Sequence, residues 1–154
     1  MGAQVKRVWR DVVDGIEVEV MEFSDTVETV EKASMLSGYP RSSIVKTLLM
    51  RADNEYIVAV VRGDRRVDVE KIQRLLGKRV ELAKSWEVKQ VLGVEVGAVT
   101  PLSPRVKSLR VLMDPQILSL DCVICGGGSL NRLYKVRVQD LLRYLNPQIV
   151  DVFR

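Results

Sequence analysis

Three places in this sequence combine residue types that could bind a ligand or assist its hydrolysis. The first is Lys46, a single cation in the β-rich run of residues 44–49. Burying an unpaired ammonium is costly, so Lys46 must face solvent, a cleft or a buried anion. Strand periodicity puts Lys46 on the same face as Ile44 and Leu48, with Thr47 on the other. By periodicity alone a solvent-exposed position is the simpler explanation, and a ligand cleft is the alternative.

The second and third places are glycine-containing segments. In Gly97-Ala98-Val99-Thr100-Pro101, glycine lets the backbone approach a ligand closely and proline fixes the exit of the loop. Such a loop can direct backbone N–H groups into a pocket, as a clamp for a carbonyl or an oxyanion. The glycines at 126–128 also expose backbone amides, but they lack the spacing of a P-loop. An ordinary surface turn would explain each segment as well.

Histidine is absent, and Cys122 and Cys125 form a lone C-x-x-C pair. The missing histidine excludes Ser-His triads, histidine general bases and histidine metal ligands. A structural zinc site needs four ligands, and no second pair exists. The pair lies in the apolar run 120–125, which predicts a buried strand, so we interpret both thiols as core residues. A redox pair and a metal shared across subunits are the alternatives.

Length and composition suit one domain over residues 1–154. The chain has 154 residues, 47% of them hydrophobic, which is enough for a single core. Twenty-four Lys and Arg residues against 20 Asp and Glu permit an anionic partner such as RNA without requiring one. Aromatic residues make up only 5%, which argues against a base-stacking platform. The longest apolar runs are too short to cross a bilayer and no signal segment is evident, so we expect a cytoplasmic protein.

Periodicity and end signals predict five helices and about seven strands in mixed order. The predicted helices are Val5–Val13 before Gly15, Val30–Gly38 capped by Thr29, Val67–Leu76, Trp86–Leu92 capped by Ser85, and Val138–Tyr144. The predicted strands are Ile16–Phe23, Ile44–Met50, Tyr56–Val61, Val80–Leu82, Leu109–Met113, Leu120–Ile124 and Leu133–Val136. This order favours a mixed α+β (α/β) fold, with a mixed, partly closed, barrel-like sheet and helices outside it. A doubly wound fold would need regular alternation of strands and helices.

Seven segments together carry a resemblance to a known family. They are Thr29-Val30-Glu31, Gly38-Tyr39-Pro40, Ile44 to Leu48, Val58 to Asp68, Gly97 to Pro101, Val111 to Asp114, and Gly126 to Gly128. In this order, over roughly residues 16–145, the sequence resembles the YbaK/EbsC family and the editing domain inserted in bacterial prolyl-tRNA synthetases. The resemblance implies a barrel-like mixed fold with surrounding helices, and no metal or organic cofactor.

The resemblance also implies an activity and a set of site residues. The family hydrolyses the ester that joins a wrong amino acid to tRNA, usually proline tRNA, with help from the terminal ribose hydroxyl and a bound water. It implies that Lys46 contacts the tRNA 3′ end or its phosphates and that Gly97 and Pro101 shape the pocket for the aminoacyl group. We take Lys46 and Gly97 as the two catalytic positions, on the hypothesis that the backbone from Gly97 to Pro101 holds the ester carbonyl. It further implies a set of substrate-binding residues: Thr47, Ala98, Val99, Thr100, Pro101, Asp114, Gly126 and Gly127.

Two other functions remain open at this point. A non-catalytic tRNA-binding or synthetase-partner module would bind tRNA with strong salt dependence and leave the ester intact. A small-molecule or nucleotide hydrolase could use the same cleft. The expected partners are aminoacylated tRNA and, as a second candidate, prolyl-tRNA synthetase. Both a monomer and a homodimer are compatible with the sequence.

Overall fold

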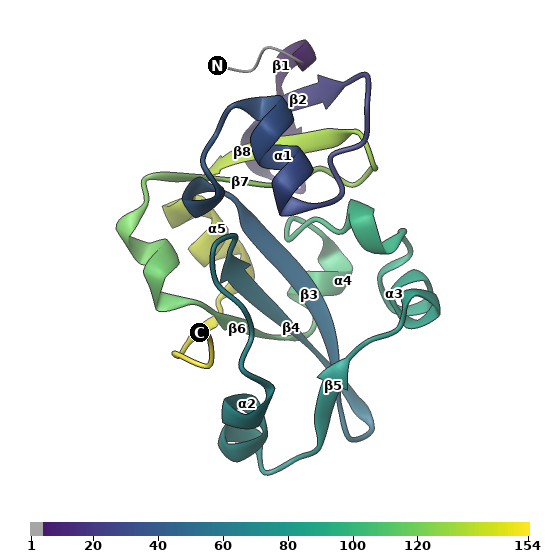
Figure 1. Cartoon of the computed structure of the whole chain (residues 1–154), viewed down its shortest axis with the longest axis vertical. Helices are drawn as coiled ribbons and strands as arrows, with labels where there is room; N and C mark the ends of the chain where they lie inside the picture. The colour runs from purple at the N-terminus through teal and green to yellow at the C-terminus, as the bar shows by residue number, and fades with distance from the viewer. Residues whose placement is uncertain (1–4) are drawn as a thin grey trace.

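The computed structural model describes residues 5–154, and two β-sheets form its frame (Figure 1). The first sheet has strand order β1-β2-β8-β7, formed by Val5–Val13, Ile16–Phe23, Arg132–Arg137 and Cys122–Gly126 respectively. The second has order β5-β3-β4-β6-β9, formed by Val80–Leu82, Val45–Ala52, Glu55–Arg62, Arg110–Met113 and Gln148–Ile149. The mixed α+β class is confirmed. The sheets are not closed into a barrel, so the barrel-like prediction is wrong.

The predicted helix at Val5–Val13 is wrong, because this segment is strand β1. It pairs antiparallel with β2, and the Val13↔Ile16 register leaves a two-residue loop. Asp14 and Gly15 both have positive φ, 48° and 83°, as a tight hairpin turn requires. Four valines also favour a strand over a helix, since branching at Cβ restricts helical rotamers. Gly15 therefore belongs to a hairpin turn and does not end a helix.

The strands predicted at Ile44–Met50 and Tyr56–Val61 correspond to β3 and β4, which form a hairpin. Strands β3 and β4 pair antiparallel over their whole length, from Val45↔Arg62 to Ala52↔Glu55. Strand β5 pairs with only the last residues of β3, from Met50 to Ala52. Most of β3 therefore has a neighbouring strand of its own sheet on one edge alone.

Five α-helices lie outside the sheets: α1 (Val30–Ser37), α2 (Val69–Leu76), α3 (Ser85–Leu92), α4 (Pro104–Lys107) and α5 (Val138–Leu145). Thr29 caps α1 as predicted, because its side chain accepts a hydrogen bond from the Lys32 amide at 3.1 Å. Ser85 does not cap α3. Lys84 occupies that position, and its amide donates to the Glu87 side chain at 2.9 Å.

Three 3-10 segments, η1 (Arg41–Ser43), η2 (Val96–Ala98) and η3 (Pro115–Ser119), shape the connections between elements. Asp114 caps η3, and Pro115 follows as its first residue, where the fixed φ of proline suits the start of a helical turn. The sequence did not predict α4, η1, η2 or β9. These segments are short, and their residues carry no strong periodic pattern.

Hydrophobic side chains form three buried clusters. The largest includes residues of both sheets and of α3, α4 and α5. A second lies against the other face of the β3–β4 sheet, under α2 and the C-terminal residues, and a third lies between the first sheet and α1. Within residues 5–154, no helix has the length and hydropathy to span a membrane.

Candidate functional site

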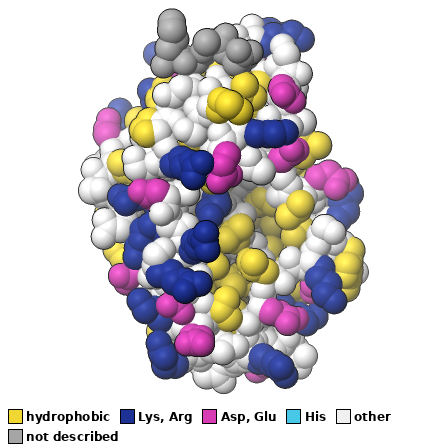
Figure 2. Space-filling view, in the orientation of Figure 1, with side chains coloured by type: hydrophobic (Ala, Val, Ile, Leu, Met, Phe, Trp, Pro, Cys, Tyr) yellow, Lys and Arg dark blue, Asp and Glu magenta, His cyan; other side chains and the backbone are white. Residues whose placement is uncertain are grey.

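A pocket of about 310 Å³ opens between α1, the upper part of β3, the η2 loop and the end of β7. Figure 2 shows a central hollow on this face, with hydrophobic side chains inside it and Lys and Arg side chains along one side. Residues from both sheets line the pocket. They are Val27 to Glu31, Ala33, Ile44 to Leu48, Gly63, Val96, Gly97, Val99, Cys125, Gly126 and Leu133.

Lys46 lines the pocket and is half-buried there. Burial lowers the pKa of its ammonium, and the nearby Glu31 carboxylate opposes this shift. Among the residues that the structure describes, none forms an ion pair with Lys46 within 4.0 Å. The side chain thus brings a positive charge to the pocket that an anionic ligand could neutralise.

Thr47 lines the same pocket, although strand periodicity places it on the opposite face from Lys46. Both residues reach the pocket because it opens at an edge of β3 and not over one face of the sheet. The Thr47 hydroxyl oxygen is buried and lacks a hydrogen-bond partner among the described residues. A buried hydroxyl without a partner is destabilising, so this oxygen is suited to bind a ligand.

The glycines of the two loop segments allow close packing at the pocket wall. A Cβ on Gly97 would lie 2.5 Å from Cβ of Glu28, and a Cβ on Gly126 would lie 2.0 Å from the carbonyl oxygen of Val99. The first loop therefore packs backbone against backbone at Val99 and Gly126, which only glycine permits. This packing joins η2 to the end of β7, so the two glycine segments form one wall.

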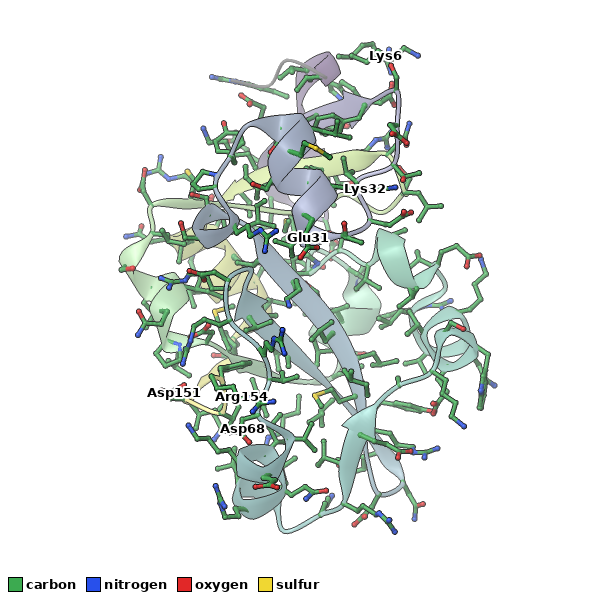
Figure 3. The ribbon with its side chains drawn as sticks, in the orientation of Figure 1. Lys6, Glu31, Lys32, Asp68, Asp151 and Arg154 are labelled. Carbon is green, nitrogen blue, oxygen red and sulfur yellow. The ribbon has the colours of Figure 1, made fainter. Side chains whose placement is uncertain are left out.

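Two carboxylates at the rim, Glu28 and Glu31, were not among the predicted site residues. Glu31 lies at the end of α1 nearest β3 (Figure 3) and pairs with Arg41 at 3.5 Å. Glu28 pairs with Lys32 at 3.3 Å. The available signal was the Thr29-Val30-Glu31 motif, because a capping residue fixes where the first turn of the helix points.

Half of the predicted site residues line the pocket. Lys46, Thr47, Gly97, Val99 and Gly126 line it, whereas Ala98, Thr100, Pro101, Asp114 and Gly127 do not. Ala98 and Pro101 are buried, and the Thr100 hydroxyl accepts from the Leu102 amide at 3.2 Å. Gly127 packs against Arg132, whose Cγ would lie 2.7 Å from an added Cβ.

Asp114 is fully buried, but its carboxylate is already occupied by protein groups. It accepts hydrogen bonds from the amides of Arg62 and Gln116 at 3.2 and 3.0 Å. It also pairs with the Arg65 guanidinium at 2.5 Å. These contacts fasten the end of β4 to the end of β6, which is a structural role.

The two cysteines are not joined by a disulfide in this structure, since both are free. They stand three residues apart on β7, so their side chains leave opposite faces of the strand. Cys125 lines the pocket, and burial raises the pKa of its thiol to about 12. Within residues 5–154, no group of three or more Cys, Asp or Glu side chains is placed to hold a metal ion.

The sequence and the fold both match known proteins. The model of the aminoacyl-tRNA editing domain family matches residues 24–144. Proline–tRNA ligase from Geobacter metallireducens is 34% identical over 108 residues, which cover 70% of this chain and 18% of the ligase. The chain thus spans about a fifth of the length of the curated relatives it matches.

Two solved structures share most of the fold. One, described as a "putative trans-editing enzyme for prolyl tRNA synthetase", superposes with a TM-score of 0.81 at 26% identity. The superposition covers 89% of this chain and 87% of that one. The other, hypothetical protein APE2540, gives a TM-score of 0.80 at 29% identity over 89% of this chain and 91% of that one.

Proposed function

The chain belongs to the aminoacyl-tRNA editing domain family, and from this premise we propose that it hydrolyses mischarged aminoacyl-tRNA in trans. The proposed substrate is proline tRNA that carries a wrong small amino acid, in the cytoplasm. One observation carries the proposal above the others: the unpaired ammonium of Lys46 and the backbone at Gly97 line the same pocket. Lys46 would bind the anionic 3′ end of the tRNA, and the backbone at Gly97 would bind the ester carbonyl.

Lys46 is proposed to bind the anionic 3′ end of the tRNA. Its half-buried ammonium has no carboxylate partner within 4.0 Å among residues 5–154. A phosphate bound near the ammonium would form an ion pair with it and so offset the hydration that the ammonium loses on burial. Lys and Arg side chains beside the hollow (Figure 2) would extend the attraction along the nucleic acid.

The η2 loop is proposed to hold the ester while water attacks. Gly97 lines the pocket, and only glycine lets its backbone lie this close to Glu28, whose Cβ takes the place of a side chain. Its peptide group can then approach the reacting carbonyl. One preorganised donor to a developing oxyanion contributes about 3 kcal/mol. The terminal ribose hydroxyl of the substrate would orient the water, and an aminoacyl ester is activated enough that such positioning suffices.

A charged-tRNA panel tests this proposal. Proline tRNA carrying alanine, cysteine or proline is incubated with the wild type, Lys46→Ala and Lys78→Ala, and the remaining ester is measured over time. Lys78 lies outside the pocket and pairs with Glu55 at 2.7 Å, so it controls for the loss of one charge. We expect the wild type and Lys78→Ala to deacylate at least one mischarged tRNA and Lys46→Ala to be strongly impaired.

The other outcomes separate the rival functions. Tight, salt-dependent tRNA binding with an intact ester would indicate a non-catalytic module, such as a partner of prolyl-tRNA synthetase. Hydrolysis of free nucleotides with inert tRNA would indicate a small-molecule hydrolase. Equal rates for the wild type and Lys46→Ala would remove Lys46 from the mechanism.

A further inference from the structure

The edge of β3 that faces the pocket has main-chain groups at Thr47 that no residue of 5–154 uses in a hydrogen bond. In an antiparallel pair, successive residues direct their N–H and C=O groups to alternate edges. The Leu49 carbonyl accepts from the Ala83 amide at 3.0 Å, on the edge away from β4. Thr47 lies two residues earlier and directs its groups to the same edge, beyond the end of β5 (Val80–Leu82).

The hydrogen bonds of β4, the strand paired with β3, also show that the main-chain groups of Thr47 point away from β4. Thr47 stands across from Val60 of β4. The Val60 carbonyl accepts from the Asp114 amide at 2.9 Å, so it points toward β6 and away from Thr47. The next contact along the free edge is the isolated bridge between Ile44 and Ile124. Thr47 therefore stands in a gap between β5 and β7, where no described strand pairs with it.

Three kinds of acceptor line the pocket into which this gap opens. They are the Thr47 carbonyl, the buried and unpartnered Thr47 hydroxyl oxygen, and the rim carboxylates of Glu28 and Glu31. Glu28, Glu31 and Lys46 are the charged residues of the lining, and the two carboxylates also pair with Lys32 and Arg41, at 3.3 and 3.5 Å respectively. A ligand group that donates several hydrogen bonds fits these acceptors best.

We infer that the Thr47 edge of β3 binds the α-amino group of the esterified amino acid. This inference rests on the proposed function. A primary or secondary amine can donate to the main-chain carbonyl and to the hydroxyl oxygen together, whereas the amino acid side chains of small substrates cannot. The pocket thereby requires a free α-amino group, in addition to whatever side chain it accepts. Thr47 is a substrate-positioning residue in this scheme, and Lys46 binds the opposite, anionic end.

The test replaces the amino group without changing the size of the substrate. Alanyl and lactyl esters of the same proline tRNA differ only by an α-amino group in place of an α-hydroxyl. Each enzymatic rate is divided by the uncatalysed hydrolysis rate of that ester, because the two esters differ in intrinsic reactivity. We expect the rate enhancement for the alanyl ester to exceed that for the lactyl ester by at least about tenfold.

Two variants assign the preference to Thr47. Thr47→Val keeps the shape of the side chain and removes the hydroxyl, and Thr47→Ser keeps the hydroxyl. We expect Thr47→Val to lower the alanyl-to-lactyl preference about tenfold and Thr47→Ser to retain it. A merely structural threonine would lower both rates together and leave the preference unchanged.

The outcomes distinguish this inference from the function beneath it. Equal enhancements for the two esters in the wild type, which needs no variant to fold, overturn amine recognition and leave deacylation standing. An unchanged preference in Thr47→Val overturns the role of the hydroxyl. A wild type that hydrolyses no ester of the panel overturns the proposed function and this inference together.

Discussion

Two polar sites of this protein look alike in the sequence and differ in the structure. Lys46 and Thr47 line the pocket at the edge of β3, and Asp114 lies at the end of β6. The carboxylate of Asp114 receives two amides and a guanidinium from its own chain. The Thr47 hydroxyl and the Lys46 ammonium have no such partners among the described residues.

The difference separates a polar group that stabilises the fold from one that awaits a ligand. A buried polar group whose bonds are all made by the protein contributes to stability, and its removal leaves partners unsatisfied. A buried polar group without partners raises the energy of the unliganded state, and a ligand can recover this cost. We therefore expect Asp114 substitutions to lower stability and pocket substitutions to lower activity.

The largest effect should come from Asp114→Ala. Removing one partner of a buried ion pair typically costs about 3–5 kcal/mol, because the Arg65 guanidinium and two amides lose their acceptor. Urea unfolding of the wild type and the variant measures the change. Asp64→Ala is the control: Asp64 is more exposed and pairs with Arg62 at 2.6 Å, so it should cost less than about 1 kcal/mol. Equal losses in the two variants would contradict the assignment of Asp114 as a structural anchor.

Unlike Asp114→Ala, Lys46→Met should lower activity without lowering stability. We expect deacylation to fall about a hundredfold, which corresponds to roughly 2.7 kcal/mol. The melting temperature should be no lower than that of the wild type. The lowered pKa of Lys46 means that the folded state holds this proton less tightly than the unfolded chain, so the charge opposes folding below pH 10.5. A drop in melting temperature with unchanged activity would instead show that Lys46 stabilises the fold and does not act in deacylation.

Gly126→Ala should affect both properties to a smaller extent. The added Cβ would lie 2.0 Å from the Val99 carbonyl oxygen, which is backbone and cannot rotate aside. We expect a loss of roughly 1–3 kcal/mol in stability, as for overpacking, and reduced deacylation because η2 is displaced. Thermal unfolding and the tRNA assay measure the two effects. Gly128→Ala separates the two causes of a loss: its Cβ would meet no atom closer than the Tyr134 hydroxyl at 4.0 Å, but its φ of 85° disfavours any side chain, so it reports backbone strain without a clash against η2.

The smallest effect should be a change in pH dependence. Burial lowers the pKa of Lys46, so deacylation that needs the ammonium should decline as pH rises through a value below 10.5. Arginine stays protonated in this range, so Lys46→Arg should keep its residual activity to higher pH. Initial rates between pH 7 and 10, corrected for spontaneous hydrolysis, test this. A shared alkaline decline in both enzymes would assign it to another group.

The sequence alone determined most local elements and a part of the site. Hydrophobic patterns and end signals located the β3–β4 hairpin, α1 with its cap at Thr29, α2 and α5, since these features depend on neighbours in the chain. The error at Val5–Val13 arose because valines at helical spacing also satisfy an edge strand, and Asp14-Gly15 serves a hairpin turn. The motifs also brought Lys46, Thr47, Gly97, Val99 and Gly126 into the candidate site.

Only the tertiary structure decided which polar groups are satisfied and which are free. The sequence could not show that β5 stops short of Thr47, because strand ends in space depend on pairing between distant segments. It could not show that Asp114 meets Arg65, 49 residues away, or that Glu28 packs over Gly97. Periodicity assigns a residue to a face of its own strand, but an edge, a pocket and a hydrogen-bond partner are made by other parts of the chain.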